Sequence, residues 1–403
     1  MATEGEVQAP SRPFVFIAGT DEPGGVHVHT VDVARALVAV GHKVSIVCPS
    51  VDYFSPMLVG ADVQVEVVAK RQVKEGAMGY WRQHLARYRE ATAVLCRGEL
   101  AQGSLGDLAG IRLATRSLYI VDHRNLDGAW ARRAPAWVHG LFTGLVATRL
   151  IGVSHEITAT ARSVMRMSAA KTVTCVNWVA PAFAESSPTE RSGAQKQLGL
   201  SPDSVVVGYH GRLGPEKRVD VLVRAVAAMN REAVQPFVVV VVGDGWKRES
   251  IEQLTRDCGV TDCFRFVGWH PDPAAAVAAF DIAVLPSLAE GFPLGLMEAM
   301  ARGAACLAHP MSSTEQLLRN GTNGVLADLT SPQSFATALE CLIEMPAPER
   351  RQLGDAAAAT IRSEYTRSRR LPDLLQALGV EQAARAVEQV LPAVRALHYR
   401  KSL

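Results

Sequence analysis

Two glutamates, Glu290 and Glu298, flank the short sequence Gly-Phe-Pro-Leu-Gly-Leu-Met. A carboxylate repels phosphate, but it accepts hydrogen bonds from sugar hydroxyl groups well. If a helix starts between the two glutamates, its free backbone N–H groups and its dipole attract an anion such as a pyrophosphate. The pattern therefore indicates a sugar-nucleotide site, with Glu290 near the hexose and Glu298 near the ribose. Two surface glutamates beside a helix start would produce the same spacing.

The elements around these glutamates are expected to bring both to one edge of a sheet. Residues 281–286 form a short apolar run, which is typical of a buried strand, and residues 294–302 have the composition of a helix that Gly303 ends. Glu290 then lies in the loop and Glu298 about one turn inside the helix. Open α/β sheets bind their ligands at the carboxyl ends of their strands, so both side chains can face one ligand.

A second strand, turn and helix precede this region, at residues 205–209, 210–218 and 219–229. The turn carries Arg212 and Lys217, together with Gly211, which lets the backbone approach a ligand. Cations beside a departing diphosphate stabilise the charge that develops when a glycosidic bond breaks. A solvated basic turn is the alternative, but two such loops in one half of the chain favour a ligand site.

The chain resembles the family four retaining glycosyltransferases, which are built from two Rossmann-like domains. The resemblance covers most of the chain, and its motifs occur in the expected order. They are Pro23-Gly-Gly-Val26, Gly211-Arg-Leu-Gly-Pro-Glu-Lys217, Val242-Gly-Asp-Gly245, Phe266-Val-Gly268 and the stretch from Glu290 to Glu298, followed by Glu315 and Gly324.

This resemblance implies a role for each donor-site residue. Arg212 and Lys217 would hold the diphosphate, Glu290 would contact the sugar, and Trp269 would lie near the base. The donor-binding residues that we expect are Gly24, Gly25, Gly211, Arg212, Lys217, Trp269, Glu290, Gly291, Phe292, Pro293, Leu294 and Glu298.

The resemblance also implies transfer with retention at the anomeric carbon. No residue of the motifs is an obvious nucleophile, so we expect a front-face displacement in which the departing diphosphate helps to take the acceptor proton. Arg212 and Lys217 would neutralise the diphosphate, and Glu290 would orient the sugar. No Asp-x-Asp pair accompanies the donor loops, so we expect neither a divalent metal nor another cofactor.

Length and composition predict an α/β protein of two domains, because 403 residues with 48% hydrophobic and 20% charged residues can bury two cores. We expect a disordered leader over 1–13 and an acceptor-binding Rossmann-like domain over 14–185. A nucleotide-sugar-binding Rossmann-like domain would follow over 186–370. The resemblance implies that these domains face each other across a cleft and that helices within 371–403 pack back on the first domain. A boundary is expected within 183–199, where Ser, Pro, Thr and Gly cluster.

The first domain begins with a β-α-β pattern: a strand at 14–18, a glycine turn, a helix that ends near Gly41 and a strand at 43–48. Its turn lacks the full G-x-G-x-x-G sequence, and Asp21 and Glu22 would repel a pyrophosphate. A nicotinamide site is therefore not expected. In the family, this glycine pair approaches the donor diphosphate.

The expected acceptor side lies after the next strands of the first domain. Family members often carry a catalytic-region histidine where this chain has His123, which makes it the candidate here. Some members instead use an Asp-x-Arg pattern, which Asp122 and Arg124 match, and a histidine without chemistry remains possible. Arg97 and Glu99 follow the preceding strand and are expected to line the acceptor site.

Several function classes are disfavoured by composition. A net charge of +2 argues against a general nucleic-acid role. The seven cysteines are scattered without zinc spacing, which indicates reduced core residues. The polar start resembles no secretory signal, and no apolar run approaches the roughly 20 residues of a membrane span. We expect a cytoplasmic monomer or homodimer.

The acceptor and the donor stay open at this point. A small cyclitol or aminocyclitol of secondary metabolism would suit a pocket lined by Asp21, Glu22, Glu99 and Asp127. The alternative is a lipid-linked or phosphoinositol acceptor reached by peripheral membrane contact through 70–90. This stretch contains six Lys or Arg residues and only two Glu, interleaved with aromatic residues. UDP is favoured over GDP, and the sugar would be glucose, N-acetylglucosamine or mannose. A nucleotide-sugar epimerase and a non-catalytic binder remain as other classes.

Overall fold

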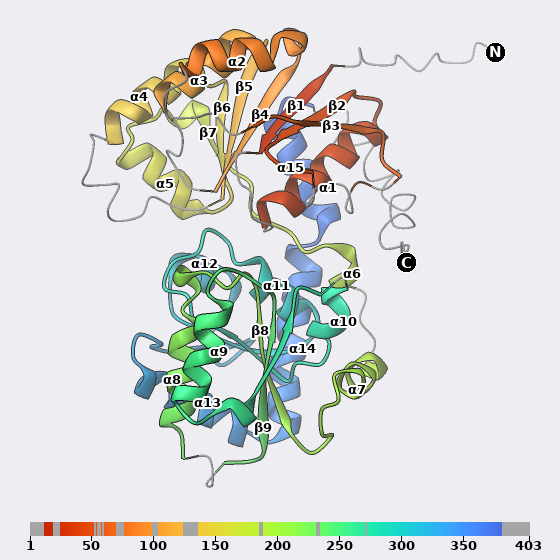
Figure 1. The fold of residues 1–403 in the computed structure, drawn as a ribbon, viewed down its shortest axis with the longest axis vertical. Helices are drawn as coiled ribbons and strands as arrows, with labels where there is room; N and C mark the ends of the chain where they lie inside the picture. The colour runs from red at the N-terminus through yellow and green to blue at the C-terminus, as the bar shows by residue number, and fades with distance from the viewer. Residues whose placement is uncertain are drawn as a thin grey trace, which may run out of the picture. The chain divides into compact units, whose positions relative to one another are not determined.

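The computed structural model describes residues 12–18, 25–51, 54, 58, 60–69, 76–98, 104–123, 136–184, 188–230, 234–270 and 272–380 (Figure 1). The chain divides into two compact units. Unit 1 comprises Met1–Asn177 and Ser368–Leu403, and unit 2 comprises Trp178–Arg367. The division precedes the segment in which a boundary was predicted, and that segment contains a helix, α7 (Pro188–Gln197).

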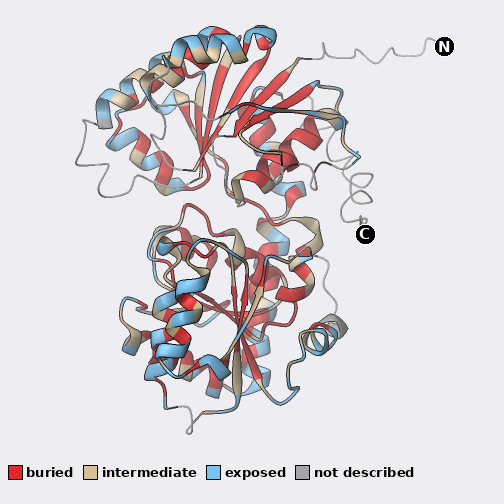
Figure 2. Ribbon diagram, in the orientation of Figure 1, coloured by how far each residue is buried: buried red, intermediate tan, exposed pale blue. Residues whose placement is uncertain are grey.

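Unit 1 contains a seven-stranded parallel sheet with the order β3-β2-β1-β4-β5-β6-β7. Its central strands are apolar on both faces because helices cover both sides, and they are buried in Figure 2. The strands are β1 (Phe14–Ala18), β2 (Val44–Cys48), β3 (Val63–Val67), β4 (Thr92–Arg97), β5 (Ser117–Asp122), β6 (Arg149–Gly152) and β7 (Thr172–Thr174).

The helices of unit 1 lie on both faces of this sheet, with α2, α3 and α4 together on one face and α1 on the other (Figure 1). They are α1 (Gly25–Ala39), α2 (Ala77–His84), η2 (Ala86–Tyr88), α3 (Leu105–Ala114), α4 (Ala136–Val146), α5 (His155–Ser163) and η4 (Ala169–Lys171).

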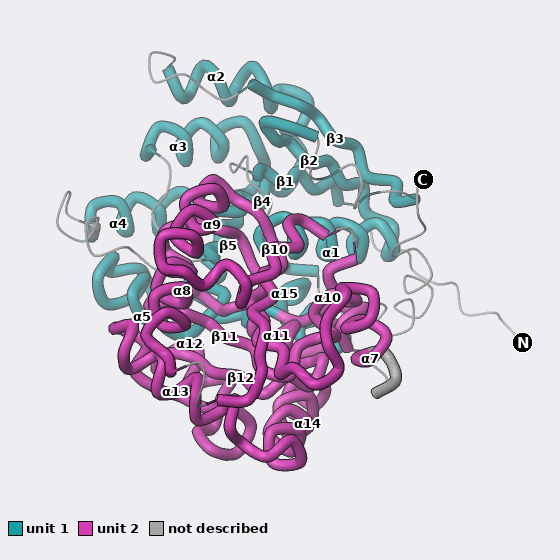
Figure 3. The backbone as a smooth tube through the Cα atoms, turned by 60° about the horizontal axis from the view of Figure 1, so that its bottom comes forward, with its two compact units in different colours: residues 1–177, 368–403 teal, residues 178–367 magenta. Residues whose placement is uncertain are grey.

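The last described helix, α15 (Arg367–Ala377), passes from unit 2 into unit 1 (Figure 3). Arg149 Nη1, on β6, donates a hydrogen bond to the carbonyl oxygen of Ala377 at 3.1 Å, and the Cys175 thiol contacts the carbonyl oxygen of Asp373. Residues 371–380 of the predicted 371–403 segment therefore pack within unit 1, and the remainder lies outside the described residues.

Unit 2 contains a six-stranded parallel sheet with the order β10-β9-β8-β11-β12-β13. Its strands are β8 (Val205–His210), β9 (Phe237–Val242), β10 (Phe264–Gly268), β11 (Ile282–Leu285), β12 (Ala305–Ala308) and β13 (Val325–Leu326). Its helices besides α7 are α6 (Pro181–Ala184), η5 (Pro215–Lys217), α8 (Val219–Ala228), α9 (Arg248–Asp257), η6 (Thr261–Cys263), α10 (Pro273–Val277), α11 (Leu294–Ala301), α12 (Ser312–Leu317), α13 (Pro332–Glu344) and α14 (Ala347–Glu364).

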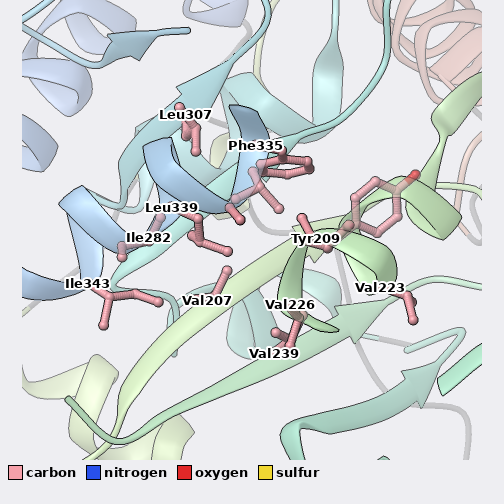
Figure 4. Packing of buried hydrophobic residues seen from close by; sticks show 14 of the residues in the cluster. Val207, Tyr209, Val223, Val226, Val239, Ile282, Leu307, Phe335, Leu339 and Ile343 are labelled. Carbon is pink, nitrogen blue, oxygen red and sulfur yellow. The ribbon is translucent and has the colours of Figure 1, made fainter. Parts of the chain in front are cut away.

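The core of unit 2 lies between its sheet and the helices α8 and α13. Val207 and Ile282 of the sheet, Val226 of α8 and Phe335 and Leu339 of α13 belong to one buried cluster (Figure 4). The amphipathic spacing of α8 explains this, since its apolar side chains lie on the face that turns to the sheet.

The structure confirms the fold class, with two parallel α/β units of Rossmann type. The strand expected at 14–18 coincides with β1, and the helix expected at 294–302 is α11, which ends one residue earlier. Among the described residues, no helix is both long enough and apolar enough to cross a membrane.

Candidate functional site

The two loops expected to form a donor site follow neighbouring strands of unit 2. β8 leads into the turn that contains η5, and β11 leads into the loop before α11. Because β8 lies between β9 and β11, the chain leaves β8 at the point where the strand order reverses. Crevices at such points are where open parallel sheets bind ligands. The sheet therefore brings both loops to one edge, as the sequence predicts.

Lys217 and Glu290, one from each loop, are in direct contact. Lys217 Nζ lies 2.6 Å from Glu290 Oε1, and the side chains are 21% and 7% exposed. Arg212 Nη2 lies 2.5 Å from Glu216 Oε1 within the first loop. The two predicted phosphate-binding cations thus each contact a carboxylate.

Glu298 lies beside His210, the last residue of β8, which was not among the site residues predicted from the sequence. His210 Nδ1 lies 3.1 Å from Glu298 Oε2. Burial lowers the pKa of His210 to about 4 and raises the pKa of Glu298 to about 8. Its position directly before Gly211, at the carboxyl end of a predicted strand, was the signal that could have identified His210.

Two glycines allow these loops to approach one another. A Cβ on Gly295, in the first turn of α11, would lie 2.2 Å from the carbonyl oxygen of His210. A Cβ on Gly243, which has φ +134°, would lie 2.0 Å from the carbonyl oxygen of Gly211. Both distances exclude a side chain, so the two glycines keep the backbone of β8 close to α11 and to the loop after β9.

Arg218 supports the turn and does not act as a free cation. Its backbone is left-handed, with φ 52°. Its guanidinium donates hydrogen bonds to the carbonyl oxygens of Pro286 (3.2 Å), Leu329 (3.0 Å) and Thr330 (2.9 Å). Arg218 therefore ties the turn after β8 to the loops after β11 and β13.

The other predicted donor residues of unit 2 differ in what they offer a ligand. Phe292 is buried, with its ring 5.6 Å from that of Tyr365, so its side chain serves packing. Pro293 caps the start of α11, Leu294 is the first residue of that helix, and Gly291 lies in the preceding loop. Trp269, directly after β10, is 65% exposed and its indole is open to a partner.

In unit 1, two of the predicted acceptor residues, Arg97 and Asp122, are buried. Arg97 and Asp122 are register partners on β4 and β5, and the guanidinium contacts both carboxylate oxygens at 2.6 Å. The residues are 3% and 0% exposed. Burial raises the pKa of Asp122, and the Arg97 charge opposes part of that rise.

His123 follows β5 directly, and its ring centroid lies 5.9 Å from that of His29 on α1. Burial, together with His29 and His27, lowers the pKa of His123 to about 3. Gly25 is the first residue of α1. Gly24, Glu99 and Arg124, and also Asp21, Glu22 and Asp127, lie outside the described residues.

The aromatic side chains of the basic stretch 70–90 are engaged within unit 1. Trp81 Nε1 donates to Asp107 Oδ1 at 2.9 Å, the buried Tyr88 donates to Glu66 Oε2 at 2.9 Å, and the Tyr80 hydroxyl donates to the carbonyl oxygen of Ala69. Part of the stretch, 70–75, lies outside the described residues. Within the described part of the chain, no cluster of three or more His, Cys, Asp or Glu residues is arranged to hold a metal ion.

Sequence comparison relates the C-terminal half of the chain to a known family. Residues 190–360 match the family described as glycosyl transferases group 1. D-inositol 3-phosphate glycosyltransferase from Geodermatophilus obscurus is 30% identical over 217 residues, which are 51% of this chain and 47% of that protein. D-inositol 3-phosphate glycosyltransferase 2 from Catenulispora acidiphila is 34% identical over 171 residues, 40% of each chain. The chain thus spans less than half the length of these curated relatives.

Solved structures match over almost the whole chain. Anabaena Alr3699/HepE, crystallised with UDP and glucose, superposes with a TM-score of 0.75 at 19% identity, covering 95% of this chain and all of that one. Sucrose-phosphate synthase from Thermosynechococcus elongatus gives a TM-score of 0.70 at 18% identity, covering 96% and 99%. Residues 190–360 thus match the glycosyl transferases group 1 family, in agreement with the resemblance seen in the sequence, and the chain has the two-Rossmann-domain fold of these solved structures.

Proposed function

We propose that this protein transfers a hexosyl group from a nucleoside diphosphate sugar, preferably a UDP-sugar, to a hydroxyl group of a small cyclitol-type acceptor. The observation that carries the proposal is the contact between Lys217 and Glu290 at the carboxyl edge between β8 and β11. The family match of residues 190–360 supports the reaction class. The names of the curated relatives support a cyclitol phosphate, and the UDP and glucose in HepE support the donor.

The ion pairs of unit 2 suggest how the donor enters. Lys217 and Arg212 each contact a carboxylate, Glu290 and Glu216 respectively, so the charges at the site are locally close to balanced. The diphosphate would take over both cations, because phosphate oxygens offer more charge and more acceptor positions than one carboxylate. Glu290, released from Lys217, would then accept hydrogen bonds from the hydroxyl groups of the sugar.

The chemical step in this proposal is a front-face displacement with retention. The acceptor oxygen bonds to the anomeric carbon on the face from which the diphosphate departs, and a diphosphate oxygen takes the acceptor proton. Lys217 and Arg212 stabilise the developing negative charge. His123 would act at the acceptor as a neutral imidazole, since its lowered pKa keeps it uncharged near pH 7.

The reaction class is tested by incubating the protein with UDP-glucose, UDP-N-acetylglucosamine or GDP-mannose, with and without inositol 3-phosphate or an aminocyclitol. Release of nucleoside diphosphate and a glycosylated product by mass spectrometry, both dependent on an acceptor, support the proposal. Conversion of the donor without an acceptor would instead indicate an epimerase. Binding of a donor without any turnover would indicate a non-catalytic binder.

Removal of Glu298 separates binding from chemistry. Glu298→Ala is expected to raise the donor KM by about tenfold or more, with a much smaller change in kcat, because a ribose contact acts alike in the ground and transition states. The cost follows from hydrogen bonds to the ionised carboxylate, worth roughly 1.5–3 kcal/mol, and is therefore expected in full above the Glu298 pKa of about 8. Steady-state kinetics over a range of donor concentrations checks this, and a fall in kcat with an unchanged KM would contradict the assignment.

A second candidate function is transfer to an acceptor carried by a membrane. The feature that favours it is an exposed apolar face of α4, and not the basic stretch 70–90. Trp137, Leu141 and Leu145 are 44%, 47% and 79% exposed and lie four residues apart, on one face of the helix. Arg166 lies over the Trp137 ring at 5.9 Å, and Lys171 Nζ binds the carbonyl oxygens of Gly144 and Ala147. An apolar helix face bordered by cations suits an anionic bilayer.

We therefore expect the full chain to co-sediment with vesicles of phosphatidylcholine and phosphatidylglycerol. The double variant Leu141→Glu/Leu145→Glu should have a vesicle partition coefficient at least about tenfold lower, because each leucine side chain contributes roughly 1.5–3 kcal/mol when it is buried in the bilayer. Val67→Glu, at an exposed apolar position on β3, is the matched control and should bind like the wild type. If the wild type stays in the supernatant, the membrane candidate is wrong.

A further inference from the structure

We infer that His210 is a positioning residue for Glu298, donating a hydrogen bond from Nδ1 to the carboxylate that receives the ribose of the nucleotide. The inference rests on the proposed function, because it assigns a partner to the residue expected at the ribose. It adds a residue to the donor site that neither the motifs nor the family resemblance identified.

The geometry places the two groups within reach but not yet bonded. His210 Nδ1 lies 3.1 Å from Glu298 Oε2, yet the angles of a hydrogen bond are not met, and Nδ1 has no other hydrogen-bond partner among the described residues. A buried nitrogen without a hydrogen-bond partner lowers the stability of the folded state. A small rotation of the Glu298 carboxylate would complete the bond, and hydroxyl groups of a bound ribose would favour that rotation by fixing the second oxygen.

The surroundings hold the imidazole in place. The ring of Phe183, on α6, stacks on it at 6.1 Å with an angle of 26° between the planes. Because Gly295 has no side chain, the first turn of α11 can pack directly against the His210 backbone. Glu298 lies on the same helix, so the imidazole and the carboxyl group belong to two elements that are locked together.

The elements packed against α11 differ in the charges that they carry: α10 carries none, whereas α14 carries Glu349, Arg350, Arg351, Asp355, Arg362 and Glu364. Glu298 is the one ionisable residue of α11, and α6 contains none. Of the charged groups in the adjoining loops, Glu290 is held by Lys217 and Arg212 contacts Glu216. Tyr365, at the end of α14, packs on Phe292. Burial is the cause of both pKa shifts in the pair, and the ionisable group that lies within 3.1 Å of the Glu298 carboxylate is His210.

This arrangement has a consequence for pH. The ribose hydroxyl groups donate to the ionised form of Glu298, whose pKa burial raises to about 8, so nucleotide affinity should increase as pH rises toward 8. A hydrogen bond from Nδ1 to the carboxylate lowers the cost of ionisation. Without that donor, the pKa of Glu298 rises further, and the affinity should be restored only at higher pH.

The test uses the full chain with UDP as the probe, titrated by calorimetry from pH 6 to 9. His210→Ala should bind UDP about tenfold more weakly than the wild type at pH 7, and the ratio of the two Kd values should shrink toward pH 9. Taking the ratio at each pH cancels the titration of UDP itself. His210→Asn, whose side-chain nitrogen can occupy the position of Nδ1, should stay within about threefold of the wild type, since one hydrogen bond to a charged group is preserved. Inorganic pyrophosphate, which has no ribose, should bind all three proteins equally.

The outcomes distinguish the inference from the function on which it rests. If the wild type binds no UDP at any pH, the proposed donor site is wrong. If UDP binds and His210→Ala matches the wild type, or if both His210 variants weaken UDP and pyrophosphate by the same pH-independent factor, then His210 has only a structural role and the inference is overturned.

Discussion

Lys217→Ala is expected to lower kcat at saturating donor by about 100- to 1,000-fold, the range seen when one preorganised charge-stabilising group is removed. Lys217 Nζ is held 2.6 Å from Glu290 Oε1 at the carboxyl edge of the sheet, with most of its side chain shielded from water. In the proposed donor complex Lys217 already contacts the diphosphate before the glycosidic bond breaks, so it needs little reorganisation and its contribution grows as negative charge develops. The donor KM should change less than kcat.

Steady-state turnover with a saturating UDP-sugar checks this prediction. Lys196→Ala, at an exposed position on α7, is the matched control and should keep wild-type kcat. Lys217→Arg should recover part of the loss, because it restores a positive charge but not the position of the ammonium group. Should Lys217→Ala retain near-normal kcat, Lys217 would have no role in stabilising the leaving diphosphate.

The positions of Lys217 and Glu290 after two strands of unit 2 were largely predictable because local patterns determine them. Apolar runs located β8 and β11, and glycine-rich turns placed Lys217 and Glu290 in the loops that follow those strands. The contact between the two side chains was not predictable, since it depends on β8 and β11 being neighbours in the sheet, which no local pattern states. His210 was missed for the same reason: its partner, Glu298, lies on a distant helix.

The first unit was less predictable at the level of its side chains. The strand ends at Arg97 and Asp122 were recognised, and both residues were expected to line the acceptor site. The structure places them opposite each other in the register of β4 and β5, where each is the other's partner. Alternation along a strand shows which residues share a face, but the register between two strands depends on the crossover that joins them. Their roles at the acceptor remain predictions, with His123 as the described residue next to them.

Disruption of the Arg97–Asp122 pair is the second change for which we expect a large effect, in this case on the free energy of unfolding. Asp122→Asn is expected to lower the free energy of unfolding of unit 1 by about 3–5 kcal/mol, because it removes the negative charge that lies against the buried Arg97 guanidinium. The pair makes two contacts of 2.6 Å, so the geometry that offsets the desolvation of both groups is lost at once. Urea unfolding followed by circular dichroism measures this as a shift in the midpoint of the unit 1 transition.

Two further variants decide whether the cost comes from a buried unpaired charge. Arg87→Gln removes a cation from the exposed pair that Arg87 forms with Glu66, and it should cost no more than about 1 kcal/mol. The double variant Arg97→Met/Asp122→Leu removes both buried charges and should recover most of the stability lost in Asp122→Asn, because apolar residues of similar volume need no counter-charge. A double variant as unstable as the single one would mean that the two residues stabilise the strand ends by other contacts. Recovered stability with lost turnover would instead place the pair in support of the acceptor site, since the backbone N–H of His123 donates to the carbonyl oxygen of Arg97 at 3.2 Å.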